Sequence, residues 1–444
     1  MLTLGNMPMI RPPRTALMGR PGRTTRAGNC RSPRPARGLS LIEVLVAMVL
    51  GLFLLAGIIQ VMVSARTAYR LAEAQARTQE NGRYAMQFLA RELRPSRSPA
   101  CRNIAHDEFE GTLNVLACSL LADVANCTGK ANIGTRVPLG YSPSATPGEA
   151  ASALAGLTAK AQTAVGERWL RGDVLVSWGT FGEGFYTQNR TIENETPEAL
   201  QKALTDPIKL VSGVTPADVK AAGITAGSLA LITDCETTDL FVVSTDKDDD
   251  DLPKLPLALD QKLNMALNKL QGSTLGISKT IRPRVFPFDF RVYFICCVNK
   301  QNGNLQGGDV GNANNCITDP VTYRPSLCRW SASAGDTQSL TMDVADLRVT
   351  YDGVIYDKDP PTRFSEPPAT VTTNNHWGRV ASARIELLVA GDDAVRRADT
   401  LPSLAAPNSP RGLGHDLKAD RRLYEAFNAT VAIRSLAPWY PPAE

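Results

Sequence analysis

The feature that most constrains this chain is a long apolar segment near its N-terminus. From Leu39 to Val63 the sequence reads LSLIEVLVAMVLGLFLLAGIIQVMV, and Glu43 is its one charged residue. A helix needs about 20 predominantly apolar residues to cross the hydrocarbon core of a bilayer. The sequence therefore predicts one membrane-spanning helix over residues 39–63.

The residues before this segment are strongly basic. Residues 1–38 contain eight arginines and no acidic residue. Because cytoplasmic flanks of membrane spans are enriched in Lys and Arg, we expect the N-terminus in the cytoplasm and the rest of the chain beyond the inner membrane. The net charge of +4 includes these arginines and would be −4 without them. The remaining chain is mildly acidic, so no nucleic-acid partner is predicted.

Three other kinds of N-terminal segment compete with this interpretation. A secretory signal peptide has an apolar core of about 7–15 residues. Here the core is longer and contains a carboxylate, although Val63-Ser64-Ala65 resembles a cleavage site. A lipoprotein signal would use Cys30, which lacks the apolar stretch that such a signal requires. A plain single-span anchor is the more serious alternative.

Glu43 argues against a plain anchor. An acidic side chain inside a membrane helix costs roughly 3 kcal/mol on insertion scales and usually marks a function or a partner. It lies four residues after Leu39, so cleavage before Leu39 would create an amine one helical turn away. Pairing with such an amine on a neighbouring subunit would offset much of the desolvation cost. It would also fix the axial register of two apolar helices.

The residues around this position resemble a known signal. Arg37-Gly38-Leu39-Ser40-Leu41-Ile42-Glu43, followed by the apolar run, resembles the class III signal of type IV prepilins. The resemblance implies that prepilin peptidase cleaves between Gly38 and Leu39 and methylates the new amine of Leu39. It also implies that Glu43 is the glutamate needed for subunit docking. A leader of 38 residues is long for such proteins, and a translation start at Met18 would shorten it without moving the cleavage site.

The helix is predicted to continue well beyond the membrane. No proline occurs between residues 36 and 94, and residues 65–93 are rich in strong helix formers with apolar residues at helical spacing. We expect one helix from Leu39 to about Leu93, closed by Pro95. Gly51, Gly57 and Gly82 are the points at which it could bend or loosen. Its second half should pack against a head domain.

Beyond Pro95 the pattern changes to short β-type runs separated by turn residues. The fold class is therefore α+β: a pilin-like long N-terminal helix, membrane-spanning in its first half, packed on an antiparallel β-sheet head domain with large loop insertions. The Ala-, Gly- and Thr-rich residues 141–166 are expected to form surface loops or short helices.

The predicted division of the chain is a leader at 1–38, the helix at 39–94 and the head at 95–444. An alternative is a head split into two subdomains that meet near 255–285. The expected strands are Asp173–Trp178, Leu229–Thr233, Leu240–Ser244, Phe290–Val298, Leu347–Tyr351 and Ala383–Val389.

The cysteine content predicts disulfides. Eight of the nine cysteines follow Cys30, and an even number fits disulfide bonding in an oxidising compartment, with reduced thiols or a metal site as the alternative. The adjacent Cys296 and Cys297 end an apolar strand, so their side chains should point to opposite faces. One could bridge within the core, and the other to the loop holding Cys316 or Cys328. The candidate disulfide cysteines are Cys101, Cys118, Cys127, Cys235, Cys296, Cys297, Cys316 and Cys328, and their connectivity does not follow from sequence.

Several segments from the end of the helix to the C-terminal region carry a second resemblance. They are Asn81–Ala85, Phe88–Arg94, Cys101, Gly172–Val176, Asp234-Cys235 with Phe241–Val243, Val380–Val389, and Arg421–Phe427 with Thr430–Arg434. These segments resemble PilW-type minor pilins. The resemblance implies a low-abundance, non-enzymatic subunit of a priming complex that contacts prepilin peptidase, major and minor pilins and a tip adhesin.

Catalytic and metal signals are weak. The three histidines, His106, His376 and His415, fall in no recognised motif, so no enzyme activity and no cofactor are expected. The acidic residues between 246 and 251 suggest a calcium loop, but they lack its glycine at position six and its glutamate at position twelve. A solvated loop is the preferred interpretation, and no metal is predicted.

These features are compatible with four functions, of which they favour one. The favoured function is a minor pilin that is inserted in the inner membrane with a periplasmic head and then built into an extracellular pilus. A minor pseudopilin of a type II secretion system would share the same signal. A tip module that binds DNA, surfaces or glycans, and a membrane-tethered periplasmic enzyme, are alternatives from other classes.

Overall fold

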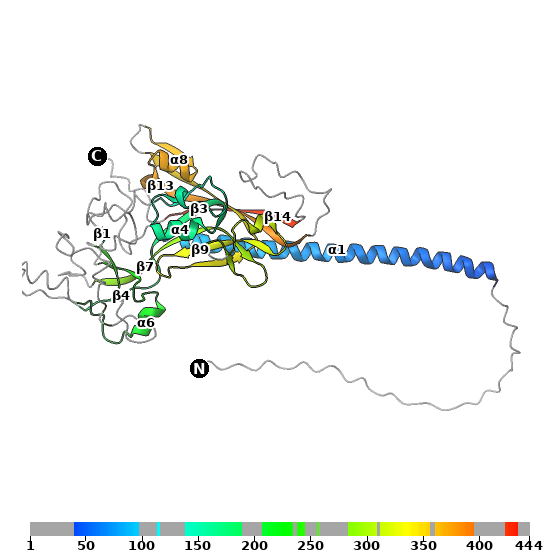
Figure 1. The fold of residues 1–444 in the computed structure, drawn as a ribbon, viewed down its shortest axis with the longest axis horizontal. Coiled ribbons are helices and arrows are strands. Elements are labelled where there is room, and N and C mark those ends of the chain that lie inside the picture. The colour runs from blue at the N-terminus through cyan, green and yellow to red at the C-terminus, as the bar shows by residue number, and fades with distance from the viewer. Residues whose placement is uncertain are drawn as a thin grey trace, which may run out of the picture. The chain divides into compact units, whose positions relative to one another are not determined.

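The computed structural model describes residues 40–96, 113–115, 138–188, 207–233, 238–244, 255, 257, 283–308, 311–355, 360–394 and 422–433. The chain divides into two compact units, Met1–Ser64 and Ala65–Glu444. The division falls within one continuous helix (Figure 1). The basic leader and the expected cleavage site at Gly38 and Leu39 lie outside the described residues, as do Cys30, His106, His415, the acidic run near residue 250 and the tail beyond residue 433.

Helix α1 runs from Leu41 to Leu93 without interruption. This confirms the long helix expected from the apolar run and the helix-forming residues after it. The helix passes through all three glycines at which it could bend or loosen, and it ends in a turn in which Ser96 N donates to Leu93 O, next to Pro95. Its buried residues begin well after the apolar run and recur at helical spacing; they are Ala74, Thr78, Gly82, Ala85, Met86, Leu89, Glu92 and Leu93.

The larger sheet has the strand order β1-β6-β5-β7-β3-β2, and four further strands pair onto it. Its pairs are antiparallel, except that β1 and β6 run parallel. The predicted strands at residues 173–178, 229–233 and 290–298 fall inside β3, β5 and β7, whereas β6 begins two residues earlier than expected. The strands are β1 Leu113–Val115, β2 Gly140–Tyr141, β3 Trp169–Thr180, β4 Phe185–Tyr186, β5 Leu229–Thr233, β6 Thr238–Val242, β7 Arg284–Asn299, β8 Leu305–Gln306, β9 Tyr323–Ser331 and β10 Thr337–Met342.

The smaller sheet is antiparallel throughout, in the order β12-β11-β13-β14. The predicted strands at residues 347–351 and 383–389 are the centres of two of its members. Its strands are β11 Val344–Ile355, β12 Thr362–Glu366, β13 Val380–Ala394 and β14 Arg422–Ala432. The α+β class with a long helix and antiparallel sheets is confirmed.

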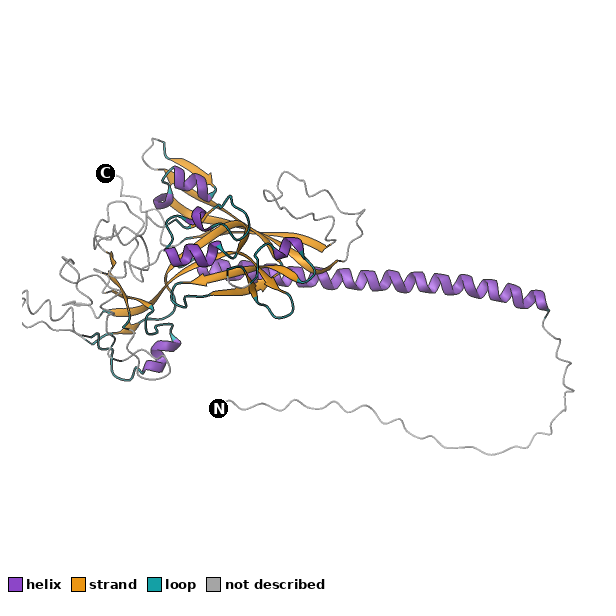
Figure 2. Cartoon of the chain, in the orientation of Figure 1, coloured by secondary structure: helices purple, strands orange, loops and turns teal. Residues whose placement is uncertain are grey.

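The remaining helices are short, as Figure 2 shows. Two of them, η2 and α4, lie in the Ala-rich stretch where loops or short helices were expected. Thr158 caps α4 by accepting from Ala161 N, and Thr215 and Asp218 form a reciprocal capping box at α6. The short helices are η2 Ala151–Leu154, α4 Ala159–Gly166, α6 Pro216–Ala221, α7 Asn315–Thr318, α8 Pro368–Thr373 and η4 Trp377–Arg379.

The main hydrophobic core joins the last turns of α1 to both sheets. Leu89 and Leu93 are fully buried in it, and the ring of Phe88 meets that of Tyr293 on β7 edge-on at 6.1 Å. A second, smaller cluster is built around β5, β6 and α6; it consists of Ile208, Leu210, Val219, Ile224, Ala230, Ile232, Phe241, Val243, Leu257 and Val285.

Two disulfides fix β7 to the segments that follow it. Cys296 bonds to Cys328 on β9, and Cys297 bonds to Cys316 on α7, with Cα–Cα distances of 5.8 and 5.7 Å. Disulfide bonding is thus confirmed for these four cysteines, and the adjacent pair reaches two different elements. Residues Cys101, Cys118, Cys127 and Cys235 lie outside the described residues.

Candidate assembly interface

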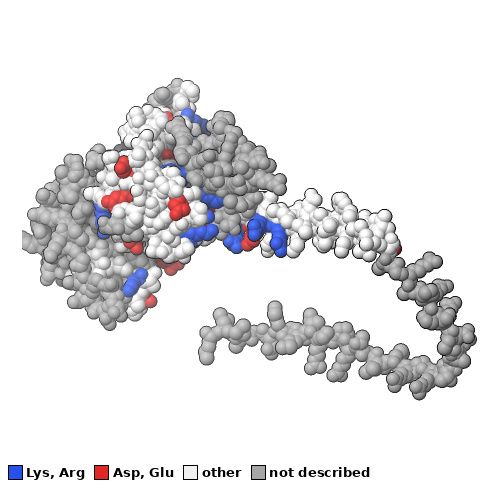
Figure 3. Space-filling view, turned by 45° about the vertical axis from the view of Figure 1, so that its right-hand side comes forward, with Lys and Arg blue, Asp and Glu red and all other residues white. Residues whose placement is uncertain are grey.

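The first half of α1 exposes a continuous apolar surface. The segment is long and apolar enough to cross a membrane, and none of its most apolar window is buried. Figure 3 shows this part of the helix as almost free of charged side chains. Soluble monomers rarely expose apolar patches of this extent. The exposed side chains are Leu41, Ile42, Val44, Leu45, Val46, Met48, Val49, Leu50, Leu52, Phe53, Leu54, Leu55, Ile58, Ile59, Val61, Met62 and Val63.

Glu43 lies in the first turn of this helix and is exposed. Its backbone N donates to Ser40 O at 2.9 Å, so the first turn is formed around it. A carboxylate is favoured at a helix N-terminus, where backbone N–H groups lack partners. No described side chain forms an ion pair with Glu43. The carboxylate is therefore accessible to a cation from outside the described chain.

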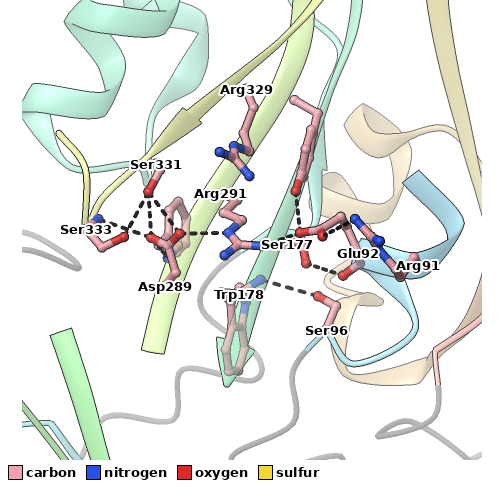
Figure 4. Close-up of polar contacts among 12 residues, drawn as sticks. Arg91, Glu92, Ser96, Ser177, Trp178, Asp289, Arg291, Arg329, Ser331 and Ser333 are labelled. Carbon is pink, nitrogen blue, oxygen red and sulfur yellow. Dashed lines mark hydrogen bonds and ion pairs between the residues drawn. The ribbon is translucent and has the colours of Figure 1, made fainter. Parts of the chain in front are cut away.

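The C-terminal end of α1 is held to β7 by a buried polar network, drawn in Figure 4. The carboxylate of Glu92 accepts hydrogen bonds from the guanidinium of Arg291 and from the hydroxyl of Tyr293, the latter at 2.9 Å. On β3, the hydroxyl of Ser177 donates to the Glu92 carbonyl oxygen at 2.9 Å. The last turn of the helix is thus bonded to two central strands of the larger sheet.

A second carboxylate lies on the other side of Arg291. Arg291 Nε donates to Asp289 Oδ2 at 2.7 Å, and the guanidinium carbon lies 3.7 Å from the centre of the Phe181 ring. Asp289 also accepts from the hydroxyl of Ser331 and from Ser333 N. The side chains of Glu92, Arg291 and Asp289 are 9%, 17% and 7% exposed, so these charges stabilise the head only while each has its partners.

The pKa values of Tyr293 and Arg291 are both shifted in the direction that keeps these side chains as hydrogen-bond donors. Burial raises the pKa of Tyr293, and the negative charge of Glu92 raises it further, so the hydroxyl remains a donor. Burial acts to lower the pKa of Arg291, but Asp289 and Glu92 outweigh it and the pKa is raised overall. Arg291 therefore stays charged between its two carboxylates.

One face of α1 approaches the smaller sheet very closely. The ring of Phe427 on β14 lies where a Cβ atom on Gly82 would be, and Gly391 on β13 faces Thr78 and Ala74. Gly82 is one of the three glycines at which the sequence allows the helix to bend or loosen. Instead the helix continues through it, and the absence of a side chain admits the aromatic ring.

Of the three histidines, His376 is the one that lies among the described residues. His376 pairs with Glu366, with 3.1 Å between Nδ1 and Oε2, beside the ring of Phe364. Across the described ranges, no group of three or more His, Cys, Asp or Glu residues is placed to hold a metal ion.

Sequence reasoning did not predict the Glu92–Arg291 network. A signal was present: Glu92 falls between the apolar Leu89 and Leu93 on one helix face, and Arg291 interrupts an apolar strand. A charge in an apolar pattern indicates a buried partner. The identity of that partner depends on the fold.

Comparison with known families gives two matches. The family model of Type IV Pilus-assembly protein W matches residues 310–435, which include β10 and the whole smaller sheet. The prokaryotic N-terminal methylation motif matches residues 33–59, which include Gly38, Leu39 and Glu43. No curated protein and no solved structure matches the chain. The first match covers the C-terminal segments on which the resemblance to PilW-type proteins was based, Val380–Val389 and residues 421–434, whereas the segments between Asn81 and Val243 lie outside it. Together the two matches support the assignment of the chain as a type IV pilus minor pilin of the PilW family.

Proposed function

We propose that this minor pilin acts in priming pilus assembly or at the pilus tip, where its head contacts other minor pilins and an adhesin. Prepilin peptidase cleaves between Gly38 and Leu39 and methylates Leu39, and Glu43 then pairs with the amine of a neighbouring subunit. The observation that carries this proposal is an exposed glutamate without a described partner at the head of an exposed apolar helix, inside the matched methylation motif.

The proposed topology places the N-terminus in the cytoplasm and the head in the periplasm before assembly. The arginine-rich leader supports this orientation. The two disulfides support it independently, because disulfides persist in oxidising compartments such as the bacterial periplasm. In the proposed topology the leader lies in the cytoplasm, the first half of the pilin helix crosses the membrane and the head lies in the periplasm.

The Glu92–Arg291 network gives the helix a defined connection to the head. Within Ala65–Glu444, the last turns of α1 are bonded to β3 and β7 and packed against β14. A helix that docks in register through Glu43 would then carry its head to a defined height along the filament. This is a structural role, and no step of it requires catalysis by the head.

A complementation experiment tests the role of Glu43. A strain lacking the gene receives wild-type protein, Glu43→Ala, or Glu80→Ala, in which an exposed glutamate further along α1 is replaced. We expect Glu43→Ala to accumulate in the membrane but to be lost from sheared pili, while Glu80→Ala is incorporated normally. Normal incorporation of Glu43→Ala would overturn the proposal. Normal pili with a defect in protein secretion would favour the pseudopilin alternative.

A further inference from the structure

We propose that Arg66, Tyr69 and Arg70 form a binding surface for anionic phospholipid headgroups at the outer face of the membrane. The surface would hold the mature subunit in the membrane before it is extracted into the pilus. This inference rests on the proposed topology. We call Arg66 and Arg70 the interface arginines.

The length of the apolar run sets the depth of these residues. The uncharged part of the run, from Val44 to Val63, has 20 residues, which as a helix is about 30 Å long, the thickness of the hydrocarbon core. Arg66 is the first charged residue after Glu43 and lies three residues beyond Val63. That places it about 5 Å past the end of the run, within a headgroup layer of about 5–8 Å on each side.

Side-chain direction brings the other two residues to the same layer. Tyr69 and Arg70 start about 10 Å past the run along the helix axis. Side chains on an α-helix tilt toward its N-terminus, which here is the direction of the membrane. The hydroxyl of Tyr69 and the guanidinium of Arg70 can therefore reach back to the headgroups. Tyrosine is enriched at this depth because its ring is apolar and its hydroxyl is polar.

The interface arginines are available to an external anion. They are one turn apart on the same helix face, both are exposed, and Tyr69 is 72% exposed between them. Neither forms an ion pair or hydrogen bond with any described residue. By contrast, the next arginine on this helix, Arg77, is bonded to Glu73 at 2.8 Å. Figure 3 shows basic side chains gathered where the apolar part of α1 ends.

Charge favours lipid phosphate as the partner. Each arginine near an anionic bilayer surface contributes about 1 kcal/mol, a factor of roughly five in affinity. Once residues 1–38 are removed, the interface arginines become the cationic side chains nearest to the span. They then lie on the outer side, so they cannot contribute to insertion as the leader does and are free to act as a headgroup contact.

The experiment uses mature protein made together with prepilin peptidase, because the arginines of the leader would bind anionic lipid themselves. The protein is reconstituted in vesicles of phosphatidylcholine with or without phosphatidylglycerol, floated on a density gradient, and released into detergent. Native mass spectrometry then counts the phosphatidylglycerol that each variant retains. The variants are wild type, Arg66→Gln/Arg70→Gln, and the control Arg83→Gln/Arg363→Gln, which removes the same charge at exposed sites outside the headgroup layer.

We expect the wild type and the control to retain phosphatidylglycerol in preference to phosphatidylcholine. The affinity of the Arg66→Gln/Arg70→Gln variant for phosphatidylglycerol should be lower by more than about tenfold. Equal retention by all three would overturn the lipid site while leaving the proposed function intact. The lipid site would also be overturned if all three proteins retained phosphatidylglycerol equally but the Arg66→Gln/Arg70→Gln variant were lost from pili. That result would assign the two arginines to a contact with a neighbouring subunit. Wild type that is not cleaved or does not float would instead contradict the proposed function itself.

Discussion

The carboxylate of Glu92, in the last turn of α1, pairs with the guanidinium of Arg291 in the middle of β7, 199 residues further along the chain. This pair connects the element proposed to enter the filament to the sheet at the centre of the head. Because both side chains are largely buried, the connection depends on both partners being present.

Replacing Arg291 should destabilise the head strongly. Arg291→Met leaves the carboxylates of Glu92 and Asp289 buried without their cation, and breaking a buried pair in this way costs about 3–5 kcal/mol. Denaturant unfolding of the protein in detergent, followed by tryptophan fluorescence, measures the loss. The control is Arg384→Met, which removes a half-exposed partner of Asp352 and should cost less than about 1 kcal/mol.

The same network predicts non-additivity. Glu92→Gln/Arg291→Met removes the unpaired charge on the helix and should be less destabilising than Arg291→Met alone. If the double variant loses the sum of the two single effects, the residues act independently and the proposed connection is wrong.

A methyl group at Gly82 should destabilise the packing of α1 on β14. Gly82→Ala improves helix propensity by about 1 kcal/mol, but its Cβ would overlap the ring of Phe427. Overpacking of this kind costs about 1–3 kcal/mol. We expect a lower free energy of unfolding for Gly82→Ala and partial recovery when Phe427→Leu is added. Gly57→Ala, where nothing lies within 4 Å, is the matched control and should cause no loss.

Asp346 should make the stability of the head depend on pH. Burial raises the pKa of Asp346 to about 7 from its ordinary value of 3.8, although Arg348, at 3.9 Å, and Arg171 act to lower it. In this range the folded state binds more protons than the unfolded state, so stability falls as pH rises from about 4 to about 7.

Asp346→Asn removes this titration. We expect it to raise the free energy of unfolding at pH 8 by about 2–4 kcal/mol relative to wild type, with little difference at pH 4. Denaturant unfolding at both pH values measures the change, and the partly exposed Asp352→Asn serves as the control. An equal effect of Asp346→Asn at the two pH values would show that burial of this carboxylate is not the cause.

The two disulfides should be detectable in the purified protein. Peptide mapping without reduction should yield Cys296 linked to Cys328 and Cys297 linked to Cys316. The second bond closes a loop of 19 residues in sequence separation, which corresponds to about 3 kcal/mol of stabilisation in the chain-entropy description. Cys297→Ser/Cys316→Ser should lose about this amount. All four cysteines found as free thiols would contradict the assignment.

Local signals in the sequence predicted α1 well. The uninterrupted apolar run predicts its first half, and the strong helix formers predict its second half. Pro95 predicts its end. The central strands were found for the same reason, because their apolar residues are contiguous. The strand β9 was missed since Pro325 and several polar residues break its pattern, and β10 is exposed at a sheet edge and reads as a loop.

Contacts between residues far apart in the sequence could not be predicted from single segments. The role proposed for Glu43 rests on neighbours within one helical turn. The role of Glu92 follows from Arg291 and Tyr293, whose positions beside it are set by the packing of β7 on α1. Likewise, Gly82 suggests a bend when only the helix is considered, and a close contact once β14 is in place.

Mass spectrometry of the N-terminal peptide of this protein, taken from sheared pili, tests the central claim most directly. The account predicts a mature chain that begins at Leu39, lacks residues 1–38 and is heavier by one methyl group on its amine. A protein that is present in pili with residues 1–38 still attached, or with an unmethylated Leu39, would contradict it.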